Sequence, residues 1–105
     1  DEEMLEDITG IVEQQFRIII NRDTFNYSRY ATHLQYLFQR IHAQKALNSD
    51  NIQMYKSLRD EFPEITDCVE KIGTHIKEKW DSELTEEEKL YLILHVNRIC
   101  VKEGL

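Results

Sequence analysis

The chain has 105 residues, of which 41% are hydrophobic and 31% are charged, so it is long enough for one domain with its own core and too short for two typical domains. Its formal net charge of −7 makes it a poor candidate for direct contact with a nucleic-acid backbone or with an anionic membrane surface, since both need basic patches. One proline and three glycines favour long helices over a many-stranded sandwich or barrel.

The first half of the chain predicts two amphipathic helices. The first covers about residues 3–21 and ends at the polar cluster 21–24, with apolar residues at helical spacing: Leu5, Ile8, Ile11 or Val12, Phe16, Ile19 and Ile20. The second covers about residues 27–44, and its apolar stripe consists of Tyr30, Leu34, Leu37, Phe38 and Ile41.

Two further helices are predicted on either side of Pro63. The polar residues 48–51 predict a loop, and a short third helix follows with one apolar face, made of Ile52, Tyr55, Leu58 and Phe62. This helix must end before Pro63, because the residue before a proline is pushed out of the helical region. Pro63 suits the first turn of a fourth helix, which carries Ile65, Cys68 or Val69, Ile72, Ile76 and Trp80.

The fifth predicted helix starts with a capping box formed by Thr85 and Glu88 and runs to about Lys102, with Gly104 as its stop. Apolar residues cover most of its circumference: Leu90, Leu92, Ile93, Leu94, Val96, Ile99, Cys100 and Val101. Such a helix is buried on several sides, so it either runs through the centre of a bundle or meets a partner subunit. The sequence therefore predicts an all-α fold, a compact five-helix bundle.

The expected cellular location follows from two kinds of segment that the sequence lacks. No apolar run approaches the roughly 20 residues of a membrane span, and no signal-peptide pattern is present. We therefore expect a cytoplasmic protein without membrane contact, in which Cys68 and Cys100 stay reduced and buried. The chain begins with Asp, so we expect residues 1–105 to be a single domain of a longer protein.

Motifs for catalysis and for metal binding are missing. The sequence has no glycine-rich phosphate-binding loop, no G-x-S-x-G, no H-x-x-x-H and no C-x-x-C. A small enzyme that uses a histidine as acid or base would need a second catalytic partner, which the sequence does not supply. We therefore expect no enzymatic activity, no cofactor and no bound metal.

His33 and His95 lie at the borders of apolar helix faces. On a helical wheel of about 100° per residue, each of them falls between a buried stripe and polar neighbours. A histidine at such a border usually packs its ring and makes one hydrogen bond. A half-exposed imidazole is also a nucleophile near neutral pH and can accept a phosphoryl group. His42 and His75 are interpreted as ordinary surface or border residues.

Two strings around these histidines resemble the signatures of the PTS regulation domain. Residues 29–41, RYATHLQYLFQRI, resemble Y-x-R-[FY]-x-T-H-L-x-[FY], and Tyr27 and Arg29 match its opening. Residues 88–99, EKLYLILHVNRI, resemble E-x-x-Y-L-x-L-H-[IV]-x-R-[IL], which closes the same domain. The resemblance covers essentially the whole chain. It points to the regulatory part of BglG-type transcriptional antiterminators and related operon regulators, and T-H-L at His33 resembles the second of two tandem domains.

The resemblance implies a function for both histidines. It implies that His33 and His95 are phosphorylated by the sugar phosphotransferase system, with the phosphocarrier HPr as donor and a sugar-specific enzyme II as a further possible partner. It also implies a homodimer, with RNA or DNA bound by a module outside this chain. Arg29 and Arg98, each about one helical turn from a histidine, are candidates for contacting the phosphate.

One alternative from another class remains open. The same sequence features fit a structural helical dimerisation or adaptor domain whose histidines are inert, since the largely apolar fifth helix suits both functions. An acid-labile, base-stable phosphate would favour the regulatory domain.

Overall fold

The computed structural model describes residues 2–43 and 52–104, which form an all-α fold. Within these residues the helices are α1 (Glu2–Phe16), α2 (Phe25–His42), α3 (Ile52–Glu61), α4 (Pro63–Trp80) and α5 (Glu86–Lys102). The expected five-helix architecture is therefore confirmed. The predicted loop 48–51 and the side chains of Ile52 and Tyr55 lie outside what the structure describes.

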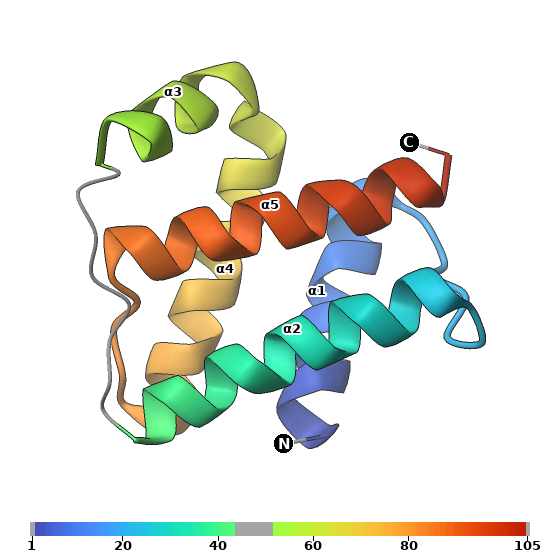
Figure 1. The fold of residues 1–105 in the computed structure, drawn as a ribbon, viewed down its shortest axis with the longest axis horizontal. Coiled ribbons are helices and arrows are strands. Elements are labelled where there is room, and N and C mark those ends of the chain that lie inside the picture. Colours follow the sequence, from blue (N-terminus) through green and yellow to red (C-terminus); the bar gives the residue numbers. More distant parts are fainter. Residues whose placement is uncertain (1, 44–51, 105) are drawn as a thin grey trace.

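The helices pack in two layers, with α2 and α5 running antiparallel side by side in front of α1 and α4 (Figure 1). Helix α5 packs against α2, α3 and α4, which places it in the middle of the bundle, as its many apolar residues predicted. None of the helices in the described part of the chain is long and apolar enough to cross a membrane.

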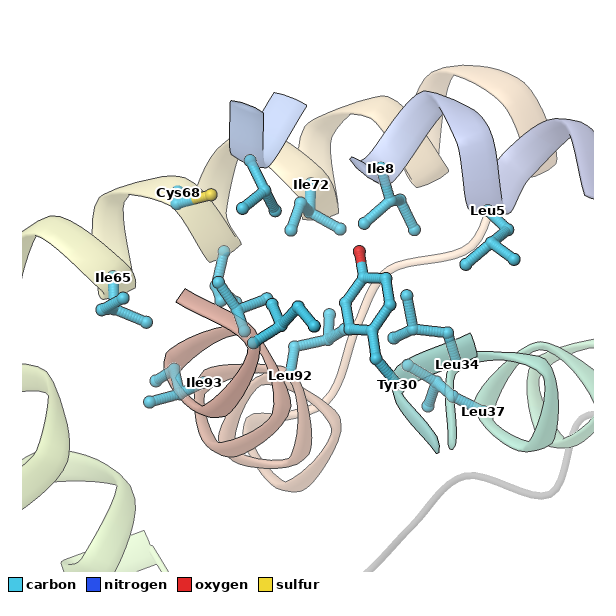
Figure 2. Close-up of a cluster of buried hydrophobic side chains, with 14 of the residues drawn as sticks. Leu5, Ile8, Tyr30, Leu34, Leu37, Ile65, Cys68, Ile72, Leu92 and Ile93 are labelled. Carbon is cyan, nitrogen blue, oxygen red and sulfur yellow. The ribbon is translucent and has the colours of Figure 1, made fainter. Parts of the chain in front are cut away.

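The core lies between the layers, where side chains of α1, α2, α4 and α5 meet (Figure 2). It contains most of the apolar residues that the periodicity selected, among them Ile8, Leu34, Ile72 and Leu92. Both cysteines are buried and free, as expected, and burial raises the pKa of the Cys68 thiol to about 12. The buried side chains of the described residues are thus mostly apolar, and neither cysteine is in a disulfide.

Three residues of the predicted apolar faces are exposed instead. Ile19, Leu94 and Val101 have 86%, 44% and 56% of their surface accessible. Helix α5 is therefore not buried all round: Leu94 and Val101 lie seven residues apart on one outward face. The prediction of a buried face was wrong for Ile19. For Leu94 and Val101, contact of this helix with a partner subunit stays a prediction.

Helix α1 ends at Phe16 and not near Asn21, because the chain turns at Arg17, whose φ of 56° is left-handed. The Ile18 amide then donates to the Glu13 carbonyl at 3.1 Å, which is the hydrogen bond of a Schellman-type end. The Glu13 carboxylate accepts from the Ile20 amide at 2.9 Å. The apolar run at 18–20 therefore belongs to a loop, in which only Ile20 reaches the core.

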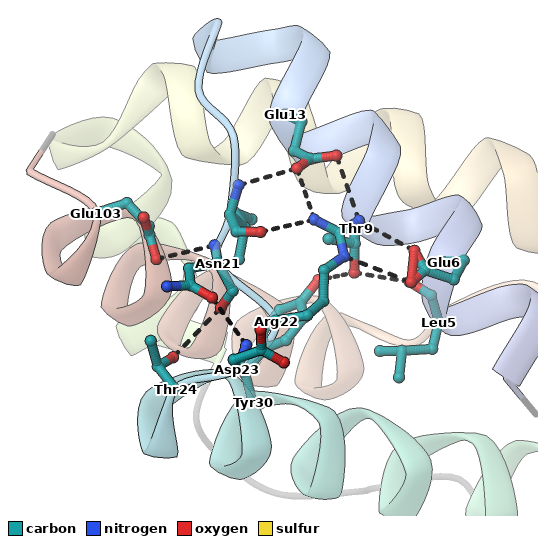
Figure 3. A network of polar contacts seen from close by, with 11 residues as sticks. Leu5, Glu6, Thr9, Glu13, Asn21, Arg22, Asp23, Thr24, Tyr30 and Glu103 are labelled. Carbon is teal, nitrogen blue, oxygen red and sulfur yellow. Dashed lines mark hydrogen bonds and ion pairs between the residues drawn. The ribbon is translucent and has the colours of Figure 1, made fainter.

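A polar network holds this loop against α1 (Figure 3). Arg22 donates to Glu13 at 2.7 Å, to Glu6 at 3.0 Å and to the carbonyl of Ile20 at 2.8 Å. The Arg22 hydrogen bond is the main cause that holds the pKa of Glu13 below its usual range. The network fixes the start of α2, where the Thr24 hydroxyl caps the helix by accepting from the Tyr27 amide at 3.0 Å.

The starts of α4 and α5 are as predicted. Pro63 occupies the first position of α4. Thr85 and Glu88 form the complete capping box of α5: the Glu88 amide donates to the Thr85 hydroxyl at 3.1 Å, and the Thr85 amide donates to the Glu88 carboxylate at 2.8 Å. Beyond α5, Gly104 has a φ of 88°, the left-handed conformation expected at a helix stop.

Candidate functional site

The packing of α2 against α5 brings His33 and His95 into direct contact. Their ring centroids are 4.1 Å apart and their planes are inclined by only 20°, so the two imidazoles are stacked. Both residues are half-buried, as the sequence predicted from their position at the borders of apolar faces. The structure therefore turns two distant positions of the sequence into one site.

Tyr91 is a third member of this site and contacts both histidines. Its hydroxyl donates to the backbone carbonyl of His33 at 3.0 Å and lies 3.2 Å from the Nδ1 atom of the same residue. Its ring meets the ring of His95 edge-on, with centroids 4.5 Å apart. Burial raises the pKa of Tyr91, so its hydroxyl is protonated at neutral pH.

Sequence reasoning gave Tyr91 no role, although a signal was available. Tyr91 and His95 are four residues apart on one helix, a spacing that places two side chains on the same face. The hydrogen bond to His33 could not be seen in the sequence, because it joins α5 to α2.

The imidazole of His95 is neutral at physiological pH. Burial lowers its pKa to about 4, and the neighbouring His33, Arg98 and Arg29 act in the same direction. A neutral imidazole keeps the lone pair on one ring nitrogen, which is the form that attacks an electrophile. The His95 ring is therefore an uncharged imidazole with one free lone pair.

Arg29 and Arg98 line a small pocket together with both histidines. Both side chains are exposed, and the guanidinium of Arg29 lies over the Phe25 ring at 5.9 Å. The pocket has a volume of about 20 Å³, and its lining contains no acidic side chain: Asn26, Arg29, Tyr30, His33, His95, Arg98 and Ile99. Two arginines and two histidines thus line one locally basic pocket on an acidic chain.

Tyr30 lines this pocket and also belongs to the core. Its buried hydroxyl lies 3.1 Å from the Thr9 hydroxyl, which in turn donates to the carbonyl of Leu5 at 2.7 Å (Figure 3). The single hydrogen of Thr9 is thus used, so Tyr30 donates to Thr9. This chain of hydrogen bonds connects the histidine-bearing helix α2 to α1 and satisfies the polar groups beneath the site.

The other two histidines lie outside the site, as expected. His42 is exposed at the end of α2 and packs on the Trp80 ring, with centroids 4.3 Å apart. His75 Nε2 lies 2.8 Å from a carboxylate oxygen of Asp7 and joins α4 to α1. Both contacts are structural.

Comparison with known proteins gives a family match over most of the chain. The family model described as "PRD domain" matches residues 6–99. The chain is 28% identical over 96 residues to "Transcription antiterminator LicT" of Bacillus subtilis (strain 168), covering 91% of this chain and 35% of that protein. It is 29% identical over 96 residues to the "Beta-glucoside operon antiterminator" of Dickeya chrysanthemi, covering 91% of this chain and 34% of that protein.

A more distant relative has the same coverage pattern. "Protein GlcT" of Staphylococcus aureus (strain Newman) is 23% identical over 87 residues, covering 83% of this chain and 30% of that protein. The chain therefore spans about a third of the length of these curated relatives. Two of the three are named as antiterminators.

Proposed function

The chain belongs to the PRD domain family, and from that premise we propose that it is the phosphorylatable regulatory domain of a longer sugar-operon regulator. In this proposal His33 and His95 accept phosphoryl groups, and their modification controls an attached nucleic-acid-binding module. The domain is of the second type in a tandem pair, since T-H-L stands at residues 32–34. The observation that carries the proposal is the stacked pair of half-buried imidazoles in a pocket that two exposed arginines also line.

The size of the pocket favours a protein as the phosphoryl donor. Pockets that enclose small ligands typically have volumes of about 300–1,000 Å³, whereas the pocket over His33 and His95 has about 20 Å³. A sugar phosphate or a nucleotide does not fit into it. A phosphohistidine on the surface of another protein needs only a reachable ring nitrogen, so the phosphocarrier HPr is the proposed donor, with a sugar-specific enzyme II as a second possible partner.

The chemical step is a transfer between two imidazoles. A lone pair on the acceptor ring attacks the phosphorus of a donor phosphohistidine that is protonated on its other ring nitrogen. A new N–P bond forms while the donor N–P bond breaks, and the electron pair of the broken bond stays on the donor nitrogen. The donor ring leaves neutral, and the acceptor ring, which keeps its own N–H, becomes a phosphorylated imidazolium.

The added charge explains why such a site can act as a switch. A phosphoryl group brings roughly −1.5 to −2 charges at neutral pH, as other protein phosphates do. At this site that charge is placed between α2 and α5 and close to Arg29 and Arg98. Charge-assisted hydrogen bonds to the arginines favour one packing of the helices, and an equilibrium between two packings is shifted.

The proposed assembly is a homodimer through the outer face of α2 and α5. Leu94, Arg98 and Val101 follow one another at spacings of four and three residues on α5, and two of these three exposed side chains are apolar. The exposed Phe25 and Tyr36 supply apolar surface on α2. This face borders the histidine pair, so a phosphate there changes the interface directly.

Recognition of nucleic acid is assigned to a part of the parent protein outside this chain. The net charge of −7 does not suit a phosphate backbone, and the basic spot at Arg29 and Arg98 is small. The matched antiterminators are about three times as long as the aligned region, which leaves room for such a module in a protein of that length.

The test is the mass of the intact protein after incubation with enzyme I, HPr and phosphoenolpyruvate. We expect a gain of one or two phosphates, acid-labile and base-stable, that falls in His33→Ala and in His95→Ala. His42→Ala, which removes a histidine outside the site, is the matched control and should take up as much as the wild type. No gain while HPr itself is phosphorylated would favour the structural dimerisation domain with inert histidines.

A further inference from the structure

We propose that Tyr91 is a positioning residue that fixes the tautomer of His33 and so selects Nε2 of that ring as the phosphoryl acceptor. The inference rests on the proposed function, because it names the atom that reacts at the proposed site. Its first step is independent of phosphorylation, since a tautomer exists in the unmodified protein.

The tautomer follows from counting hydrogens around the Tyr91 oxygen. The His33 carbonyl can only accept, so at 3.0 Å the single hydroxyl hydrogen of Tyr91 lies between these two oxygens. The Nδ1 atom of His33 is 3.2 Å from the same hydroxyl oxygen. Since no hydrogen of Tyr91 remains for this contact, Nδ1 must be the donor and must carry the proton.

The consequence concerns the other ring nitrogen. In a neutral imidazole with a proton on Nδ1, the lone pair is on Nε2. The lone pair of His33 is therefore on the nitrogen that Tyr91 does not contact. The ring itself is held on two sides, by the hydrogen bond to Tyr91 and by the stacked ring of His95.

The same hydrogen bond suits the product of the transfer. After an N–P bond has formed at Nε2, the ring is an imidazolium that keeps its proton on Nδ1. The hydroxyl oxygen of Tyr91 can still accept a hydrogen bond from this Nδ1–H group. The bond becomes stronger, because a charged donor binds more strongly than a neutral one. Tyr91 thus suits the ring before and after the reaction without itself touching phosphorus.

Tyr91→Phe separates this role from the packing of the ring. The substitution removes only the hydroxyl, which bonds to His33, and keeps the ring that lies edge-on against His95. Tyr27→Phe is the matched control, because Tyr27 is a buried tyrosine of α2, the helix of His33, and lies outside the pocket lining. Both variants lose one phenolic oxygen, but only Tyr91→Phe loses a hydrogen bond to His33, the proposed phosphoryl acceptor.

The first measurement is the imidazole tautomer of His33 by ¹H–¹⁵N correlation spectroscopy on the unphosphorylated protein. We expect the Nδ1–H form in the wild type and in Tyr27→Phe, and a shift toward Nε2–H in Tyr91→Phe. An Nε2–H tautomer in the wild type would overturn the inference. Because the wild-type measurement needs no substitution, it can contradict the inference even if Tyr91→Phe folds poorly.

The second measurement is phosphorylation in the presence of enzyme I, HPr and phosphoenolpyruvate, with the phosphohistidine isomer read by ³¹P spectroscopy in a His95→Ala background. We expect the Nε2 isomer at His33, and in Tyr91→Phe a rate lower by about two- to tenfold, the size of one net hydrogen bond, with some Nδ1 isomer. If Tyr91→Phe has the rate and the isomer of the parent protein, the role of Tyr91 is overturned and the proposed function stands. Uptake in the wild type but none in His95→Ala would overturn the inference alone, because His33 would then not accept phosphate. No uptake in the wild type, with phosphorylated HPr present, would overturn the proposed function and with it the role of Tyr91.

Discussion

The rings of His33 and His95 are stacked with their centroids 4.1 Å apart, although they belong to different helices and are separated in the sequence by half of α2, by α3 and α4, and by half of α5. This contact makes the two proposed acceptors dependent on each other. A charge that is added to one ring interacts strongly with the other ring, because the two are close together and partly buried.

We predict that the second phosphate is added less readily than the first. Two phosphoryl groups on stacked rings are like charges a few ångströms apart, and the second can be added only if the rings separate. The doubly phosphorylated fraction should therefore stay well below the product of the occupancies measured in His33→Ala and His95→Ala. A time course of intact mass gives the doubly phosphorylated fraction of the wild type and the occupancy of each single variant. A doubly modified fraction equal to that product would show that the two sites are independent.

We predict that His95 makes the domain less stable in mild acid. Its pKa is about 4 in the folded protein and near 6.5 when unfolded, so between these values the unfolded state binds more protons. The free energy of unfolding should fall as the pH drops from 6.5 to 4 and should show no further contribution of His95 below 4. We expect a loss of about 1–3 kcal/mol, in view of the partial burial of the ring.

Urea unfolding at several pH values measures this effect, and His95→Gln supplies the reference because glutamine does not titrate. The groups that face the ring, His33, Arg29 and Arg98, stay in place in that variant. The difference in stability between wild type and His95→Gln should shift with pH over this window. Parallel curves would mean that the pKa of His95 is not lowered.

We predict that Arg98→Gln slows phosphorylation by about three- to tenfold, the range for one charge-assisted hydrogen bond at a partly exposed site. Arg98 lines the pocket that contains the histidines. Its positive charge is expected to stabilise the negatively charged phosphoryl group during transfer. Rates of phosphate uptake from HPr give the measurement. Arg59→Gln on α3 removes an equal charge outside the pocket lining and should change the rate little. Equal effects of both substitutions would point to overall charge and not to a phosphate contact.

We predict that Leu94→Arg shifts the domain toward a monomer. Leu94 is exposed on the outer face of α5, so the substitution should leave the fold intact while placing a charge in an apolar interface. Analytical ultracentrifugation over a range of concentrations measures the dissociation constant. Met54→Arg, at an exposed apolar residue of α3, is the control. If both variants associate like the wild type, the dimer uses another face.

We predict that Arg22→Met lowers the free energy of unfolding by about 1–2 kcal/mol, because one guanidinium binds two carboxylates and a carbonyl while half-buried. The double variant with Glu13→Gln should lose less than the sum of the two single variants, since both remove the same contact. Urea unfolding of the four proteins measures this coupling. Additive losses would mean that the Arg22–Glu13 pair contributes nothing.

The sequence alone determined the fold class and the approximate positions of the helices. Apolar spacing near 3.6 residues selected the buried stripes of α2 and α4, and local hydrogen-bonding chemistry placed the starts of α4 and α5 at Pro63 and Thr85. It also placed His33 and His95 at the borders of buried faces, and the motifs around them pointed to the family that the comparison then established. These features are local, so a periodicity or a short string is enough to detect them.

Only the tertiary structure decided what these positions do together. The end of α1 depends on Glu13, whose carboxylate and carbonyl bind the amides of Ile20 and Ile18, and this outcome overrides the helical pattern of an apolar run. The stacking of His33 on His95, the lowered pKa of His95 and the hydrogen bond of Tyr91 to His33 all arise where α2 packs against α5. A sequence states which residues share a face of one helix, whereas the partners across a helix interface are fixed by how two faces pack.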